Sequence, residues 1–250
     1  MLSRKIFIWA VLVLIPSVAM AQPEEVTGAD ILANSAKAYA KISRYVGTSA
    51  VITRMVSQVS EAQAVDGAST ANAKIEFNRG GKIKIEGIQT YGDRYSIISG
   101  GKTATLTYMA DDKERIEKDL DVERAIGSMS AVSADAASAI PAALLDMRVY
   151  SPLNTLHAPQ LQGFEKISIW ECYKVVDFDS VRNIKSTFWI DRESFLIRQH
   201  LTEQGEMNLE GAYLDRPKVR ESLEKTQEFM EKIGMKSITT LHIVGIEEAQ

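Results

Sequence analysis

The chain has 250 residues, with 29 lysine and arginine side chains against 33 aspartate and glutamate side chains, which gives a formal net charge of −4. A mildly acidic chain without a basic tract argues against nucleic acid and anionic membranes as partners. Its single cysteine, Cys172, excludes an internal disulfide. Because Cys172 lies in an apolar, strand-like context, we interpret it as a buried structural residue; an intermolecular bridge and a reactive thiol are the alternatives.

The first 21 residues have the pattern of a cleaved signal peptide. The basic pair Arg4-Lys5 precedes an apolar run at 6–15, and Ala19-Met20-Ala21 forms a small-residue cleavage site. Pro16 ends the apolar run before it reaches the ~20 residues that a membrane-spanning helix needs, which disfavours an uncleaved anchor. We therefore expect a soluble, exported, periplasmic mature chain, 22–250, that forms a single domain with a net charge of about −6.

From residue 29 to residue 109 the pattern predicts one helix and then an antiparallel meander. Residues 29–45 carry apolar side chains at helical spacing, and Asp30 can cap this helix. The strand-like runs that follow alternate apolar and polar residues or are rich in β-branched residues. They are 46–60, 72–78, 83–88, 95–99 and 103–109. A polar connector near Asp66-Gly67 separates the first two runs, and Gly87 is expected to mark a β-bulge.

The alternation buries one face of each strand, so the sheet needs a cover on its apolar face. Residues 120–148 supply one, because they are rich in apolar residues at helical spacing. Breaks near 133–135 and at Pro141 predict two or more short helices. The acidic residues at 119–123 lack the glycine and the distal glutamate of a calcium-binding EF-hand loop, and we expect them to complement the dipole of the helix that follows.

The chain then returns to strands at 164–178, 182–190 and 195–203. The polar residues 191–194 join the last two strands as a hairpin, in which Asp191 hydrogen-bonds the turn backbone. One face of this hairpin is expected to carry Phe188, Ile190, Phe195 and Ile197, with Thr187, Arg198 and His200 interleaved.

Two elements are predicted at the end of the chain. Residues 216–233 carry an apolar stripe at helical spacing, with Pro217 near the start and Gly234 just past the end, which predicts an amphipathic helix. Residues 237–246 predict a last strand that closes the domain.

The motifs of the chain do not indicate catalysis. His157, His200 and His242 lack the spacing of metal ligands, and we expect ordinary strand or loop histidines. The segment 100–103, Gly-Gly-Lys-Thr, is similar to the end of a phosphate-binding loop, but it lacks the first glycine and lies between strands, so it predicts a hairpin turn. No nucleophile signature occurs and no carboxylate pair is singled out. The sequence thus predicts a protein that is not an enzyme, with no catalytic residue, metal site or cofactor.

Four short motifs between residues 29 and about 203 carry a family resemblance. They are Asn78-Arg79; Ser99-Gly100-Gly101-Lys102-Thr103 followed by Leu106 and Tyr108; Ile140-Pro141 followed by Leu144-Leu145; and Phe188-Trp189-Ile190-Asp191 followed by Phe195-Leu196-Ile197. Together they resemble the periplasmic outer-membrane lipoprotein-sorting family, which has a LolA/LolB-like fold. Gly80 stands where this family has a proline after the arginine, so gating of a cavity by Arg79 is a hypothesis only.

The resemblance implies an α+β, mainly β fold: a strongly curved antiparallel sheet, or incomplete β-barrel, with helices covering its concave apolar face. It also implies a carrier or accessory protein that binds lipid or lipoprotein acyl chains in an apolar cavity for transport towards the outer membrane, with an inner- or outer-membrane protein as a further partner. The candidate ligand-binding residues are Ile75, Phe77, Arg79, Ile83, Ile85, Leu106, Tyr108, Leu144, Leu145, Phe188, Ile190, Phe195 and Ile197.

Alternatives remain open at this stage. The apolar residues of sheet and helices fill an ordinary packed core as readily as they line a cavity. A non-enzymatic envelope sensor or interaction module, which contacts a protein through the helix at 216–233, is the alternative function. A hydrolase whose site carries no recognisable motif is the third.

Overall fold

The computed structural model describes residues 26–60, 63–80, 82–89, 92–130, 133–147, 151–154, 156–180, 183–205, 228, 232 and 234–250. The predicted signal peptide, 1–21, lies outside these residues. The predicted helix at 216–233 also lies outside them, except for Glu228 and Lys232, which are both helical.

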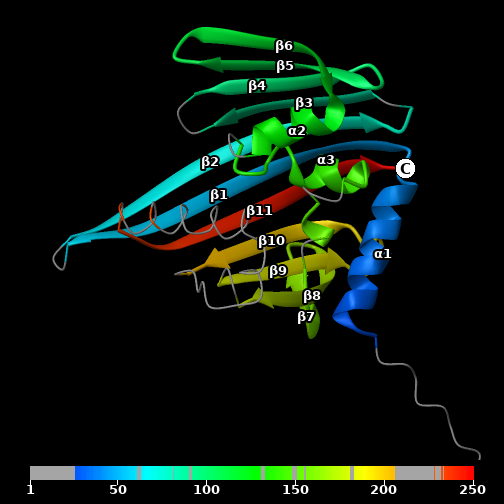
Figure 1. Cartoon of the computed structure of the whole chain (residues 1–250). Helices are drawn as coiled ribbons and strands as arrows, with labels where there is room; N and C mark the ends of the chain where they lie inside the picture. The colour runs from blue at the N-terminus through cyan, green and yellow to red at the C-terminus, as the bar shows by residue number, and fades with distance from the viewer. Residues whose placement is uncertain are drawn as a thin grey trace, which may run out of the picture.

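Eleven strands of the described chain form one antiparallel sheet (Figure 1). They are β1 (Arg44–Ser60), β2 (Gln63–Asn78), β3 (Lys82–Gln89), β4 (Arg94–Ser99), β5 (Thr103–Ala110), β6 (Lys113–Asp121), β7 (Gln160–Ile167), β8 (Trp170–Asp179), β9 (Ile184–Asp191), β10 (Ile197–Gln204) and β11 (Met235–Ala249). Their order is β6-β5-β4-β3-β2-β1-β11-β10-β9-β8-β7, so β11 joins the N-terminal meander to the C-terminal one.

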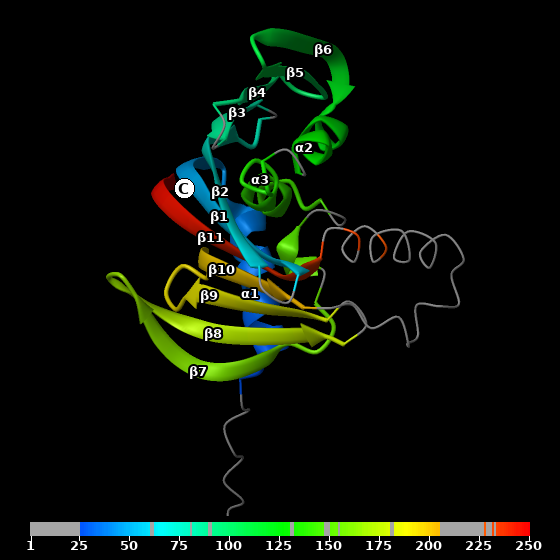
Figure 2. The same cartoon turned by 90° about the vertical axis from the view of Figure 1, so that its left-hand side faces the viewer.

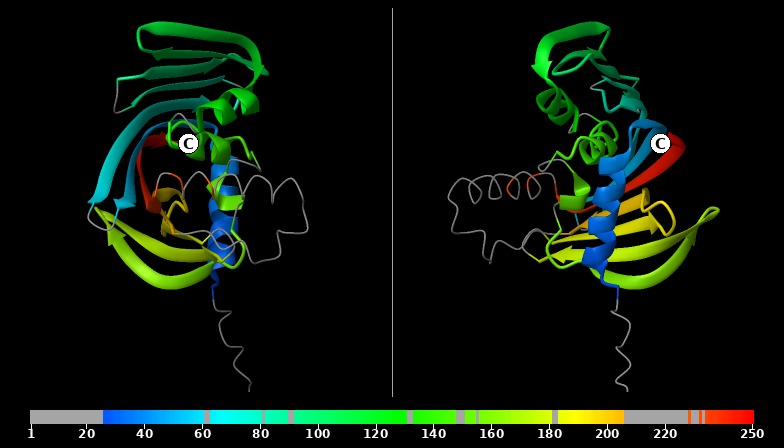
Figure 3. Two further views of the ribbon diagram at one scale, coloured as in Figure 1. Left: turned by 60° about the vertical axis from the view of Figure 1, so that its left-hand side comes forward. Right: turned by 90° about the vertical axis from the view of Figure 1, so that its right-hand side faces the viewer.

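Three α-helices and one 3-10 turn of the described residues cover the concave side of this sheet. They are α1 (Gly28–Lys41), α2 (Val122–Ser130), α3 (Ala139–Leu144) and η1 (Pro152–Asn154). The sheet bends around them and is not closed into a barrel, because β6 and β7 remain as its two edges (Figures 2 and 3). The predicted fold class is confirmed. No helix within the described ranges is long and apolar enough to cross a membrane.

Burial of alternate side chains turns one face of the sheet toward the helices. Ile75 and Phe77 on β2 are 0% and 4% exposed, and Ile83 and Ile85 on β3 are 3% and 0% exposed, as the alternation predicts. These side chains belong to one apolar core that also includes residues of all three helices. Tyr39 of α1 fixes its helix to the far part of the sheet, because its hydroxyl accepts the N–H of the first residue of β10 at 3.2 Å.

Two helices begin with side-chain caps. Thr27, not Asp30, is the N-cap of α1: its hydroxyl accepts the N–H of Asp30 at 3.2 Å, and the Asp30 carboxylate accepts the N–H of Thr27 at 3.0 Å. The prediction of Asp30 as the cap was therefore wrong, because it occupies the third helical position of a capping box. Before α2, Asp121 accepts the N–H groups of Glu123 and Arg124 at 2.9 and 3.2 Å, which confirms that acidic residues serve this helix start.

Two predicted boundaries were wrong. Asp66-Gly67 lies inside β2, because β1 and β2 remain paired as far as Ser60 opposite Gln63. The run 164–178 is two strands, because the chain reverses at Ser168, whose φ of 56° is left-handed, and β7 then pairs with β8. In both places the hydrogen bonds to a neighbouring strand outweigh the local propensities on which the prediction relied.

The predicted β-bulge at Gly87 was also wrong, because Gly87 pairs with Ala73 and with Tyr95 without a shift of register. Glycine is needed there for space: a Cβ atom at position 87 would lie 2.2 Å from the Cζ atom of the Tyr95 ring. The Tyr95 hydroxyl crosses this glycine and donates to the carbonyl oxygen of Asn72 at 3.0 Å. The strand β6 was not predicted, because its charged and almost wholly exposed residues have no apolar periodicity.

The hairpin of β9 and β10 turns at Asp191, as predicted. One carboxylate oxygen accepts two N–H groups of the turn, at 2.9 and 3.2 Å, and the other accepts the guanidinium of Arg198, at 2.5 and 3.0 Å. A shift of register at the start of β10 then changes the phase of the strand. As a result His200 lies on the same face as Phe188, and the predicted interleaving of these two residues was wrong.

Candidate ligand cavity on the concave face

The structure places the apolar residues predicted to bind a ligand between the sheet and its helices. Nine of them are at most 5% exposed, and Tyr108, Leu145 and Phe195 are partly buried against the same core. The nine are Ile75, Phe77, Ile83, Ile85, Leu106, Leu144, Phe188, Ile190 and Ile197. The described residues thus form a continuous apolar layer, and its role in binding a ligand stays a prediction.

Arg79, the remaining predicted residue, lies at the edge of this layer. Its Nε atom donates to the carbonyl oxygen of Ile42 at 2.7 Å, and its Nη2 atom donates to those of Tyr39 at 2.8 Å and Leu144 at 3.4 Å. Arg79 therefore connects the end of α1 to the end of α3. A cation at this place also complements the negative end of the α1 dipole.

Two cavities lie at the two ends of α3. The first, of about 390 Å³, includes Ala139 at the start of α3 in its wall. The second, of about 460 Å³, is bounded by Leu145 and Met147 just after α3, together with Phe77 and Ile83 from the predicted set. Of the predicted residues, Phe77, Ile83 and Leu145 line the second cavity, and none lines the first one. The first cavity meets the apolar core through Leu156, which lines the cavity and packs against that core.

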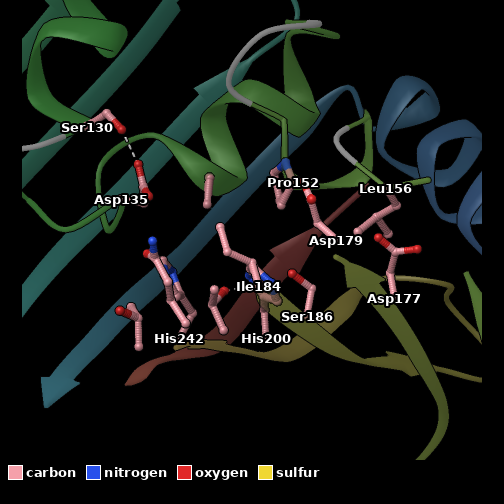
Figure 4. Close-up of a pocket in the computed structure, with 14 residues that line it drawn as sticks. Ser130, Asp135, Pro152, Leu156, Asp177, Asp179, Ile184, Ser186, His200 and His242 are labelled. Carbon is pink, nitrogen blue, oxygen red and sulfur yellow. Dashed lines mark hydrogen bonds between the residues drawn. The ribbon is translucent and has the colours of Figure 1, made fainter. Parts of the chain in front are cut away.

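The first cavity has a floor of strands and a roof formed by the connections between helices (Figure 4). Its floor comes from β8 to β11, and its roof from the ends of α2 and α3 and the segment around η1. The floor residues are Asp177, Asp179, Ile184, Ser186, His200, Thr202, Gln204, Thr240 and His242. The roof residues are Ser130, Asp135, Ala139, Pro152 and Leu156. Polar groups are thus brought next to an apolar layer.

Two histidines lie side by side on this floor. His200 on β10 is directly opposite His242 on β11, and their ring centroids are 5.5 Å apart. The other face of the His200 ring stacks on Phe188, with a centroid distance of 4.0 Å and an angle of 9°. Burial, and then the neighbouring His242, lowers the pKa of His200 to about 3, and burial also lowers the pKa of His242. Both imidazoles are therefore uncharged at neutral pH.

Three carboxylates complete the polar part of the wall, and each has a defined partner. Asp177 accepts the N–H groups of His157 and Ala158, the latter at 2.7 Å. Asp179 lies 3.5 Å from the Nε2 atom of His157. On the roof, Asp135 accepts the hydroxyls of two serines that flank it in the chain. These contacts hold the carboxylates in place beside the cavity.

Sequence reasoning missed the two histidines and the three carboxylates as a group. They come from three strands and one helix connection, so no local spacing relates them. The signal that remained was the position of both histidines within β-type runs, where cross-strand pairing can bring distant residues together.

Metal-binding clusters and the single thiol are the other groups that bear on chemistry. Within the described ranges, no group of three or more His, Cys, Asp or Glu side chains is arranged to hold a metal ion. Cys172 is buried, as we interpreted it from the sequence. Burial, and then the nearby Asp191 carboxylate, raises the pKa of its thiol to about 11, so the reactive thiolate is not the populated form at neutral pH.

No family model and no curated protein matches the chain in sequence. Among solved structures, LprF from Mycobacterium bovis is similar with a TM-score of 0.45 and 9% identity, over 89% of this chain and 92% of LprF. An outer-membrane lipoprotein-sorting protein domain from Vibrio parahaemolyticus has a TM-score of 0.31 and 12% identity, over 89% of this chain and 91% of that domain.

MucB is similar with a TM-score of 0.42 and 13% identity, over 89% of this chain but only 60% of MucB. MucB from Pseudomonas aeruginosa has also been solved in complex with MucA. At such identities a likeness concerns the fold alone. The open, curved antiparallel sheet with helices on its concave face is what confirms the fold class expected from the sequence.

Proposed function

We propose that this chain is a non-enzymatic binding protein of the bacterial envelope, which takes up acyl chains of lipids or lipoproteins for transport towards the outer membrane. The observation that carries the proposal is the pair of cavities at the two ends of α3, the second of which is lined by residues of the apolar layer. In this proposal Phe77, Ile83 and Leu145 contact the hydrocarbon in the second cavity, and the other predicted apolar residues support that wall from the core.

The sizes and energies are suitable for such a ligand. Cavities of about 390 and 460 Å³ are in the range of ~300–1,000 Å³ that small-molecule sites occupy. Each buried CH₂ group contributes ~0.8 kcal/mol, so part of one acyl chain supplies enough binding energy without covalent chemistry. Transfer of the ligand to an acceptor requires that this binding energy stay limited, and a cover made of short helices, among them the six-residue α3, contributes less buried contact than one long helix.

Arg79 is the residue that we propose to couple α1 and α3 to loading. It contacts the last turn of α1 and the end of α3, so its loss would free both helices at one edge of the apolar layer. Arg79 would thus control access to the cavities by holding α1 and α3 over the sheet.

The test is to fill the first cavity and to measure ligand binding. Ser186→Phe places a ring in this cavity, whereas Lys185→Phe places the same ring on the opposite, exposed face of β9. If the ring displaces two CH₂ groups of a fluorescent acyl probe, Ser186→Phe should weaken binding about tenfold. Lys185→Phe should bind like the unaltered protein. Two outcomes would contradict the proposal. One is a purified protein whose solvent extract contains no lipid and which binds no probe, and the other is equal probe binding by the two variants.

A second candidate is an interaction module that binds another envelope protein. It is favoured by two exposed apolar side chains on the edge hairpin of β7 and β8, since Phe164 is 62% exposed and Ile169 is 76% exposed. Native mass spectrometry after purification without detergent separates the two candidates. A co-purified lipid supports the carrier, and a lipid-free protein with a stable protein partner supports the module.

A further inference from the structure

We propose that the cavity over β10 and β11 holds the polar head of the bound acyl compound, and that this head is an uncharged or cationic group rather than an anionic one. The inference rests on the proposed function and names the class of ligand that it serves. Its three supports are a buried imidazole nitrogen without a partner among the described residues, the charge of the cavity wall, and the apolar part of that wall.

The first support is the hydrogen-bonding state of His242. Its side chain is 5% exposed, and within the part of the chain that the structure describes its Nδ1 atom has no hydrogen-bond partner. Buried polar atoms in folded proteins are nearly always paired, so this nitrogen, on a side chain that lines the cavity, needs a partner that the described residues do not supply. Figure 4 shows His242 and His200 on the strand floor beneath Asp135 of the roof.

The second support is the charge that surrounds a ligand in this cavity. Asp135 on the roof and Asp177 and Asp179 on the floor are carboxylates, and the two imidazoles beside them are uncharged at neutral pH. A phosphate or carboxylate entering this space meets three carboxylates and no lysine or arginine among the lining residues, so its negative charge is repelled. A hydroxyl, an ester or an ammonium group meets no such penalty.

The third support is the position of the polar groups relative to the apolar layer. The ring of His200 is in stacking contact with Phe188, which is fully buried in the apolar layer, and Ala139 lies in the wall of the same cavity. The apolar part of the cavity wall itself is formed by Ala139, Pro152, Leu156 and Ile184, so a head group that bonds to His242 leaves its hydrocarbon next to these residues. One ligand can satisfy both surfaces only if it is amphipathic.

The experiment compares two ligands that differ only in a phosphate, 1-palmitoylglycerol and 1-palmitoylglycerol 3-phosphate. Each is titrated at pH 7.5 against the full mature protein loaded with N-phenyl-1-naphthylamine, an apolar fluorescent probe. We expect the concentration of 1-palmitoylglycerol that displaces half of the probe to be at least about tenfold lower than that of 1-palmitoylglycerol 3-phosphate. Equal displacement, or stronger displacement by the phosphate, overturns this inference and leaves acyl binding intact. Failure of both ligands to displace the probe overturns the proposed function as well.

Two variants test the residues themselves. His242→Phe keeps a ring of similar size but removes the Nδ1 atom, so the affinity for 1-palmitoylglycerol relative to that for the apolar probe should fall about tenfold. Asp135→Asn removes one negative charge, and asparagine tolerates the left-handed backbone of this position, where φ is 69°. The Asp135→Asn variant should reduce the ratio between the displacing concentrations of the two ligands several-fold.

The matched control is Asp112→Asn, the same change at another left-handed position, φ 58°, which is exposed in the turn between β5 and β6. In the Asp112→Asn control, the ratio between the displacing concentrations of the two ligands should equal that of the unaltered protein. If Asp112→Asn narrows the preference as much as Asp135→Asn does, the effect belongs to the net charge of the protein and the inference is overturned. An unchanged preference in Asp135→Asn overturns it equally.

Discussion

Replacing Arg79 by leucine should destabilise the protein strongly, because one guanidinium supports two helices. The side chain makes two short hydrogen bonds, at 2.7 and 2.8 Å, to carbonyl groups at the end of α1, and a longer one, at 3.4 Å, to the end of α3. Hydrogen bonds to charged groups contribute about 1.5–3 kcal/mol each. Because the site is only partly buried, we take the lower value for the two short bonds and expect a loss of ~3 kcal/mol in the free energy of unfolding.

The assay is urea or thermal unfolding, followed by circular dichroism. For a domain of this size each kcal/mol shifts the melting temperature by roughly 2–4 °C, so Arg79→Leu should lower it by about 6–12 °C. The matched control is Arg44→Leu, which removes an ion pair to Glu248 from a side chain that is 59% exposed and should cost at most ~1 kcal/mol. Arg79→Lys should fall between them, because lysine keeps the charge but not the planar fork of donors.

This prediction is refuted if Arg79→Leu lowers the free energy of unfolding no more than Arg44→Leu does. That outcome would mean that the carbonyl groups at the end of α1 are equally well satisfied by water. A second readout separates stability from gating. If Arg79 couples the two helices to loading, the folded Arg79→Leu variant should bind or release an acyl probe at a different rate, and unchanged loading would contradict that role.

Two further predictions concern buried ionisable groups. Asp191→Asn should cost about 3–5 kcal/mol of unfolding free energy, because it leaves the buried charge of Arg198 without its counterion; a loss under ~1 kcal/mol in urea would contradict a buried pair. Because burial and then His242 lower the pKa of His200 to about 3, the unfolded chain takes up a proton first as the pH falls below ~6.5. Stability should be level above that pH and decline toward pH 3 by up to ~1.4 kcal/mol per pH unit, and His200→Gln should flatten this decline.

Much of the fold could be predicted because residues that are buried on one face only repeat with the period of their strand. Ile75, Phe77, Ile83 and Ile85 follow this rule, and each is buried where the alternation places it. The errors occurred where pairing, not side-chain chemistry, decides the structure. Asp66 lies in a strand because β1 extends beside it, and a local propensity for turns carries too little energy to end a ladder of hydrogen bonds.

Of the candidate site, the apolar residues could be predicted from the sequence, and the polar cavity could not. The apolar wall follows from periodicity within each strand, so a single strand is enough to identify it. The polar cavity depends on which strands become neighbours and on a shift of register at the start of β10, which turns His200 toward Phe188 and His242. The order of the strands and this register shift depend on the whole sheet. The polar end of the proposed site could therefore not be predicted from any single segment of the sequence.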